Sequence, residues 1–180
     1  MDILAHGVYN IALQKSIKNK KKTKKEIFVA FLWGVLPDFM AFAPSFFIAI
    51  FGSSFSFFDH HAPVAGFDIA SSIYPFTHSL VIFLAVFFIV FILIRKFYWP
   101  MLGWGLHILV DMPLHTPEFF PTPFLFPISD WTLPFGIAWS TPYIWASFWA
   151  AAFIWLGYLW YKRRKNKNLE KISEDQKSSQ

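Results

Sequence analysis

Four ionisable residues lie within or beside apolar stretches of this chain, where an isolated charge is unfavourable. Asp38 is the only charged residue in the stretch 27–51, and His107 and Asp111 are the only titratable groups in a second stretch. His78 stands just before a third. A carboxylate at the middle of a bilayer costs about 2.5–3.5 kcal/mol. Gathered around a divalent cation, these imidazoles and carboxylates would instead form a binding site.

The spacing of His107 and Asp111 gives the most specific local signal. Residues four apart project from the same face of a helix, so the pair can act as a two-ligand unit for a hard or borderline cation. The same pair can instead be a buried hydrogen-bonded contact that fixes helix packing. Both interpretations stay open at the level of the sequence.

The other polar residues also have plainer interpretations. Asp38 can be a turn residue between two interfacial helices, and His78 can cap the start of its helix. His6, in a short amphipathic N-terminal segment, can face water. His60 and His61 fall in a Ser/Phe-rich segment, 52–76, which the sequence predicts to be a loop with solvated histidines.

Composition narrows the class of protein. Of the 180 residues, 56% are hydrophobic and 22% aromatic, and only 15% are charged. Soluble domains are roughly 45–50% apolar, so a water-soluble globule is disfavoured. The chain has no cysteine, which excludes disulfides, thiolate ligands and a cysteine nucleophile, and leaves His, Asp and Glu as metal ligands. The length predicts a single membrane domain, 1–165, followed by a polar, disordered tail, 166–180.

The apolar runs predict an all-α, polytopic membrane protein with about four transmembrane spans. A short helix is expected first, over residues 2–16. The predicted spans are 27–51, 77–94, 98–112 and 143–161. Pro37 is expected to break the first span next to Asp38. Between the last two spans, the Pro/Phe-rich segment 113–134 is predicted to be a re-entrant or interfacial loop.

The net charge of +5 comes from short basic tracts, chiefly 15–25 and 162–167. Beside apolar spans these tracts indicate cytoplasmic anchors, so no nucleic-acid partner is expected. Both termini are then cytoplasmic, in a multi-pass protein of the cell (inner) membrane. The depth of each candidate ligand in the membrane can be counted at about 1.5 Å per helical residue from the nearest basic tract. These depths are about 13 to 25 Å, a spread that allows the ligands to lie close together.

The motifs occur in a specific order along the chain. They are His6, Gly34-Val35-Leu36-Pro37-Asp38, Thr77-His78-Ser79, and Gly103-Trp104-Gly105-Leu106-His107-Ile108-Leu109-Val110-Asp111. This series resembles the membrane-bound metal-dependent hydrolases, the YdjM-like family, and more distantly zinc-dependent phospholipase C. A departure is that Phe39 and Met40 follow Asp38, where that family usually has a further acidic residue. The likeness implies that the metal ligands are His6, Asp38, His78, His107 and Asp111, with His115 mapped as a further one.

The resemblance implies a membrane-embedded hydrolase that acts on a lipid-linked or amphipathic ester or phosphoester through a metal-activated water. One or two divalent ions are expected, with Zn²⁺ the first choice, and Asp38 or Asp111 would act as general base. The bilayer and a lipid-linked substrate are the expected partners. The alternative is a non-enzymatic transporter or ion-binding protein that uses the same His/Asp cluster.

Overall fold

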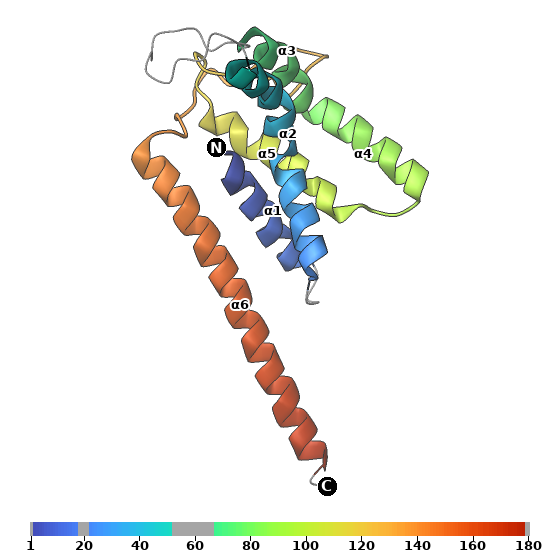
Figure 1. The fold of residues 1–180 in the computed structure, drawn as a ribbon. Helices are drawn as coiled ribbons and strands as arrows, with labels where there is room; N and C mark the ends of the chain where they lie inside the picture. The colour runs from blue at the N-terminus through green and yellow to red at the C-terminus, as the bar shows by residue number, and fades with distance from the viewer. Residues whose placement is uncertain (1, 18–21, 52–66, 179–180) are drawn as a thin grey trace.

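The computed structural model of the chain describes residues 2–17, 22–51 and 67–178, and every regular element among them is a helix (Figure 1). The elements are α1 (Ile3–Ile17), α2 (Lys24–Phe51), α3 (Phe67–Thr77), α4 (Leu80–Ile94), the 3₁₀ helix η1 (Trp99–Met101), α5 (Leu102–Leu114) and α6 (Pro142–Ser178). The predicted all-helical class is confirmed. His60 and His61 lie outside the described residues.

The N-terminal helix α1 packs along α2 (Figure 1). Its first turn is capped by Asp2, whose carboxylate accepts a 2.9 Å hydrogen bond from the backbone N–H of Ala5. The two helices touch backbone to backbone at Gly34. A Cβ at this position would lie 2.5 Å from the carbonyl oxygen of His6. Glycine therefore sets the distance between α1 and α2.

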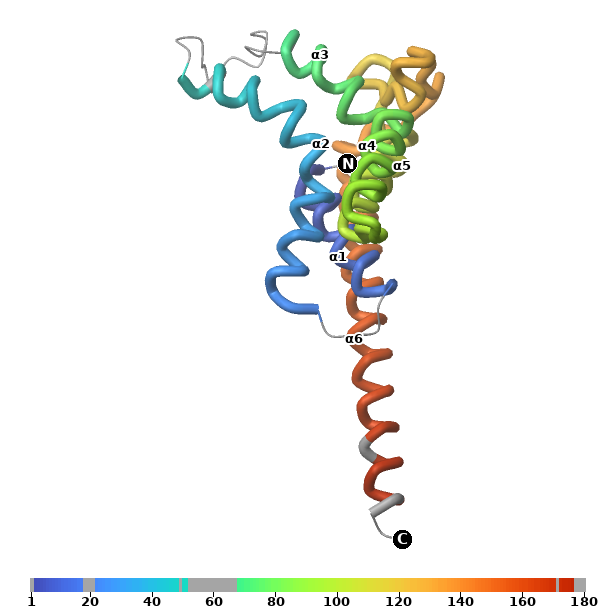
Figure 2. Tube along the Cα trace, turned by 90° about the vertical axis from the view of Figure 1, so that its right-hand side faces the viewer, coloured from blue at the N-terminus to red at the C-terminus, as the bar shows by residue number. Residues whose placement is uncertain are grey.

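The predicted break at Pro37 is wrong, because α2 is one helix that runs through both Pro37 and Pro44. A proline inside a helix removes one backbone hydrogen bond and crowds the preceding turn, which bends the helix without necessarily ending it. Figure 2 shows that α2 changes direction along its length. Since α2 is continuous, Asp38 is not a turn residue between two interfacial helices.

The short helix α5 lies at the centre of the molecule and does not span a membrane. Its 13 residues cover about 20 Å, against a hydrocarbon core of about 30 Å. The predicted span over 98–112 is therefore wrong. Two glycines allow the neighbouring helices to pack closely on α5: a Cβ at Gly103 would clash with the side chain of Asn10, and one at Gly105 would lie 2.8 Å from the ring of Phe83.

The helices α3 and α4 meet at a bend of 57° and can cross a membrane only as one bent span. The sequence missed α3, because 52–76 was predicted to be a loop. Ala70 and Tyr74, one turn apart on α3, are buried. At the bend, the hydroxyl of Ser79 accepts from the N–H of Ile82 at 3.2 Å and so caps α4. His78 is thus not the capping residue.

The proline-rich segment after α5 is irregular, as predicted for 113–134, and folds back over the helix ends. Its backbone N–H groups at Ile137 and Trp139 donate to the carbonyls of Pro113 and Leu114, at 3.0 and 3.2 Å. Near its middle, the carbonyl of Phe124 accepts from the first N–H of α4 at 2.9 Å. These bonds tie the end of α5 to the bend between α3 and α4.

Within the described parts of the chain, two helices are long and apolar enough to cross a membrane, Lys24–Ile48 and Pro142–Gln176. The number of crossings rises to three if the bent pair of α3 and α4 counts as one span. The prediction of four spans is therefore too high. The last helix, α6, starts close to the predicted position and continues to Ser178, so the tail predicted to be disordered is helical over its described residues. α6 packs mainly against α1, which leaves most of its surface exposed (Figure 1).

Candidate metal centre

Four predicted ligands from three parts of the fold meet in one buried cluster. Asp38 comes from the middle of α2, His78 from the bend between α3 and α4, and His107 and Asp111 from successive turns of α5. Each offers one ligand atom, and these atoms all lie within 4.8 Å of one another. All four residues are at most 5% exposed. The sequence prediction that these side chains converge is confirmed.

The individual distances describe a compact set. The Nε2 atoms of His78 and His107 are 3.1 Å apart. Asp111 Oδ2 lies 3.1 Å from His107 Nε2 and 3.6 Å from His78 Nε2. Asp38 Oδ1 lies 3.5 and 3.4 Å from the same two nitrogens. Two ligands bound tetrahedrally at about 2.1 Å from one ion are about 3.4 Å apart, so these separations match a small divalent cation.

The fold fixes which nitrogen of His107 faces the cluster. Its Nδ1 lies 2.7 Å from the carbonyl oxygen of Gly34. A carbonyl can only accept, so Nδ1 carries the hydrogen and, in the neutral ring, Nε2 presents its lone pair to the other ligands. Gly34 lies on the turn of α2 that precedes Pro37. The same glycine thus spaces α1 from α2 and orients His107.

His78 is oriented by its neighbour and by α3. Its Nδ1 lies 2.8 Å from Thr77 Oγ1, and that hydroxyl donates to the carbonyl of Tyr74 at 3.2 Å. Because the hydroxyl hydrogen is used in this way, Nδ1 donates to the oxygen and Nε2 is left to face the cluster. The ring of Tyr74 stacks on the imidazole with centroids 3.7 Å apart. Trp104 Nε1 donates to the carbonyl of Thr77 at 2.6 Å and holds the bend in place.

With both histidines in these tautomers, the cluster consists of acceptors that face one another. The two Nε2 atoms, each with its lone pair towards the other ligands, are 3.1 Å apart. Carboxylate oxygens of Asp38 and Asp111 are the other two acceptors of the cluster. Such an arrangement is repulsive in a buried site unless a positive charge lies between the groups. A divalent cation supplies that charge, as does an extra proton on an imidazole. The geometry shows that the cluster can hold a metal ion.

His6 and His115 border the cluster on either side of Asp111. The His6 ring stacks on His107 with centroids 3.5 Å apart, and its Nε2 lies 3.0 Å from Asp111 Oδ1. His115 Nε2 lies 3.7 Å from Asp111 Oδ2. Burial lowers the pKa of His6 to about 4 and also lowers the pKa of His115, which favours neutral imidazoles at pH 7. The interpretation that His6 faces water is wrong, since it is 2% exposed.

Three supporting groups were not identified from the sequence. The Gly34 carbonyl, the Thr77 hydroxyl and the Tyr74 ring orient the two histidines through contacts that depend on tertiary packing. Gly34 and Thr77 do belong to the motifs around Asp38 and His78. Their place within these motifs was the one available signal for them. Tyr74 lies in the segment that was predicted to be a loop.

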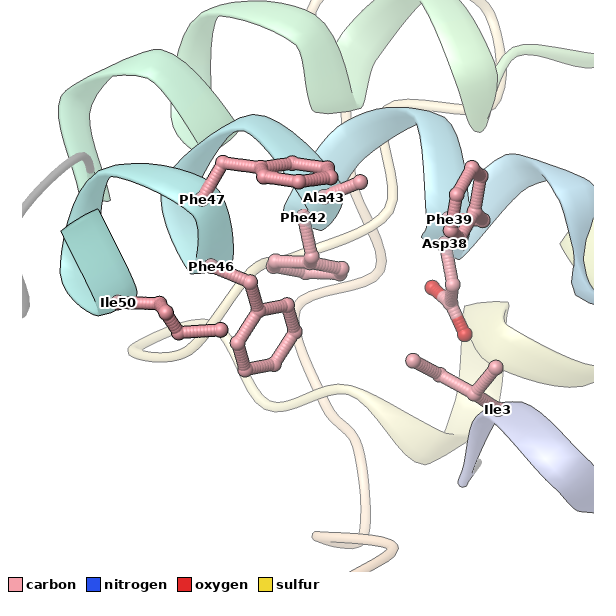
Figure 3. A pocket seen from close by; sticks show the side chains of 8 residues that line it. All are labelled: Ile3, Asp38, Phe39, Phe42, Ala43, Phe46, Phe47 and Ile50. Atoms are coloured by element: carbon pink, nitrogen blue, oxygen red, sulfur yellow. The ribbon is translucent and has the colours of Figure 1, made fainter.

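Two cavities open beside the cluster. A groove of about 140 Å³ runs along α2 and ends at Asp38 (Figure 3). A wider cavity of about 560 Å³ is bordered by His115 and by three tryptophans, Trp139, Trp145 and Trp149. Both cavities include Phe42 and Phe46 in their walls. The cluster is thus buried but lies next to space that a ligand can occupy.

Comparisons of the chain with protein-family models, with curated proteins and with solved structures find no match.

Proposed function

We propose that the protein is a metal-dependent hydrolase that acts, at or in a membrane, on a lipid-linked or amphipathic ester or phosphoester. The observation that carries this proposal is the buried set of four mutually facing acceptors, held at separations that suit one divalent ion. The order of the motifs, which resembles that of membrane-bound metal-dependent hydrolases, supports the same function. The apolar surface and the candidate spans favour a substrate supplied by the bilayer.

We assign the ion to three protein ligands, His78, His107 and Asp111. Three ligands plus an open fourth position are typical of catalytic zinc, and two imidazoles with one carboxylate are a common set. Zn²⁺ is therefore the ion we propose. When bound, it lowers the pKa of a coordinated water towards about 7 and polarises the bond that is cleaved. His6 and His115 flank Asp111 and are placed to position its two oxygens.

Asp38 is the group we assign as general base. It is 5% exposed, against 0–1% for the other three, and it borders the groove along α2. Asp38 is therefore the member of the cluster that lies closest to space for water and substrate. In the proposed step, Asp38 takes a proton from the attacking water, whose oxygen bonds to the phosphorus or carbonyl carbon. The bond to the leaving alcohol breaks, and Asp38 returns the proton to the alcohol oxygen.

Two substitutions test these roles separately. The protein is purified in detergent, its zinc content is measured by elemental analysis, and its hydrolysis of phosphatidylglycerol and phosphatidic acid is assayed. His107→Ala removes a ligand and is expected to abolish both zinc binding and turnover. Asp38→Asn removes the base at constant shape and is expected to keep the zinc while turnover falls by about 10²–10⁴-fold.

Three outcomes would contradict the proposal. Absence of zinc from the native protein would show that the cluster is a protonated, hydrogen-bonded network and not a metal site, and full zinc in His107→Ala would show that zinc binding does not depend on His107. Zinc in the native protein without hydrolysis of any lipid, together with ion flux in proteoliposomes that depends on Asp38 and Asp111, would show the transporter alternative to be correct. Ala151→Trp, on the exposed face of α6, serves as the control for purification and folding.

A further inference from the structure

The groove beside Asp38 is formed by a repeat along one face of α2. Asp38, Phe42, Phe46 and Ile50 are spaced four residues apart, so they lie along a single face of the helix. Figure 3 shows their side chains in this order, with the carboxylate at one end and Ile50 at the other. Twelve residues of helix measure about 18 Å. The groove is therefore long and narrow, with its polar group at one end.

The walls of this groove are otherwise apolar. Its lining residues are Ile3, Asp38, Phe39, Phe42, Ala43, Phe46, Phe47 and Ile50. The carboxylate of Asp38 is the only polar side chain among them. At its far end the groove is open to the surroundings, since Phe46, Phe47 and Ile50 are each about 60% exposed. Phe46 and Phe47 belong to a candidate membrane span that ends at Ile48, so a lipid chain is the apolar partner that we assign to this surface.

The wider cavity lies next to the groove and, unlike it, has several polar side chains in its walls. The two share Ile3, Phe42 and Phe46 in their walls, so the cavities are neighbours. The wider one includes Asp2 and His115 as well as tryptophans, and its volume of about 560 Å³ lies within the roughly 300–1,000 Å³ of small-molecule sites. His115 is 7% exposed, and its Nδ1 has no hydrogen-bond partner among the described residues. A buried polar atom of this kind needs a ligand group or water.

We propose that the α2 groove holds a single acyl chain of the substrate, with the scissile ester or phosphoester at Asp38 and the polar head group in the wider cavity beside His115. The length of the groove, about 18 Å, is close to the half-thickness of the hydrocarbon core, about 15 Å. A chain can enter sideways from the bilayer past Phe46 and Ile50. This inference rests on the proposed function and specifies its substrate as a chain-bearing lipid.

The first test fills the groove. Ala43 lines the groove and is small, so Ala43→Trp would occupy the space that the chain needs. Turnover is measured on dihexanoyl and dioleoyl phosphatidylglycerol, and the ratio of long-chain to short-chain turnover is expected to fall about tenfold as buried methylenes lose their contacts. Ala151→Trp on α6 adds the same side chain away from the cavities and is expected to leave the ratio unchanged. An unchanged ratio in Ala43→Trp would overturn the proposal.

The second test does not require hydrolysis. Phosphatidylglycerol with a diazirine on its palmitoyl chain is incorporated into vesicles with the protein, and the crosslinked residues are mapped by mass spectrometry. Labelling at Phe42 and Phe46 is expected to fall several-fold in Ala43→Trp, while labelling at Leu93, on the exposed face of α4, stays constant. If Phe42 and Phe46 are labelled no differently in the variant, the groove is not a chain site.

The two tests separate this inference from the proposed hydrolase. Groove labelling that depends on Ala43, in a protein without hydrolytic activity, would support the chain site and contradict the hydrolase. Hydrolysis with an unchanged chain-length ratio and unchanged labelling would support the hydrolase and contradict the chain site.

Discussion

At the residue scale, the candidate site depends on contacts that fix the orientation of two imidazoles. Each histidine has its Nδ1 engaged by the protein, His107 with the Gly34 carbonyl and His78 with the Thr77 hydroxyl. Partners of this kind fix the tautomer and the ring orientation of a metal-binding histidine, and their loss lowers metal affinity by about 10–100-fold. The role of Thr77 can be tested without altering any ligand.

Thr77→Val keeps the shape of the side chain and removes the hydroxyl. We expect zinc affinity to fall about tenfold, because the His78 ring loses the nearer acceptor of its Nδ1–H and keeps only the Tyr74 carbonyl at 3.3 Å. The measurement is a competition titration against a chelator of known affinity. Thr77→Ser restores the hydroxyl and should restore affinity. Ser72→Ala is the matched control, because it removes an exposed hydroxyl from the same helix. Equal affinities in Thr77→Val and the native protein would show that Thr77 does not orient His78.

The sequence predicted the site best where both ligands lie on one helix. His107 and Asp111 are four residues apart on one helix, and their proximity follows from helix geometry alone. The position of His6 depends on tertiary packing, since α1 reaches the cluster only because Gly34 has no side chain. The repeat of Asp38, Phe42, Phe46 and Ile50 was visible in the sequence. Its meaning as a groove required the positions of Ile3 and the neighbouring helices.

The misassigned elements share one physical cause. Hydropathy measures how apolar a segment is, and it does not distinguish a helix surrounded by lipid from one surrounded by protein. α5 was predicted to span for this reason, although its buried glycines and its length of 13 residues place it in the core. α3 was missed because its apolar stripe is short and contains Pro75. Burial of Tyr74 against its neighbours stabilises the helix in spite of that proline.

At the element scale, the approach of α1 to α2 is sensitive to a single methyl group. Gly34→Ala places a Cβ 2.5 Å from the backbone oxygen of His6 and 2.8 Å from the Cα of Gly7. Backbone atoms cannot rotate away, so the helices must separate, at a cost of about 1–3 kcal/mol. We expect a lower melting temperature in detergent and weaker zinc binding, because His6 and the Gly34 carbonyl shift together.

Gly157 on α6 provides the matched control for that prediction. A Cβ at this position meets no atom within 4 Å, so Gly157→Ala should leave the melting temperature unchanged or slightly raised, since alanine favours a helix over glycine by about 1 kcal/mol. If Gly34→Ala melts at the same temperature as Gly157→Ala and binds zinc equally well, the α1–α2 contact is not tight enough to matter.

At the scale of the whole molecule, the basic ends of α1, α2 and α6 lie opposite the proline-rich segment (Figure 1). The end of α1, the start of α2 and the distal part of α6 all lie towards one end, while α3 and the segment between α5 and α6 lie towards the other (Figure 1). The described residues of the first group include Lys15, Lys22, Lys24 and Lys25 and the basic tract at 162–167. Positive charge next to membrane-crossing helices is retained on the cytoplasmic side. We therefore propose that the basic end is cytoplasmic and that the proline-rich segment is on the opposite face.

The absence of native cysteine makes this topology directly testable, because any introduced thiol is unique. Lys24→Cys and Lys167→Cys place a thiol at the basic end, and Ile128→Cys places one on the exposed proline-rich segment, where Ile128 is 78% exposed. A membrane-impermeant maleimide applied to intact cells should label only Ile128→Cys, and applied to inverted membrane vesicles it should label only the other two. Detergent-solubilised protein, in which all three should react, controls for thiol accessibility. Labelling of Ile128→Cys and Lys24→Cys from the same side would mean either that α2 does not cross or that the bent pair of α3 and α4 crosses as a third span. If α2 does not cross, it lies on the membrane surface, and the acyl-chain groove along it would have to take its chain from that surface.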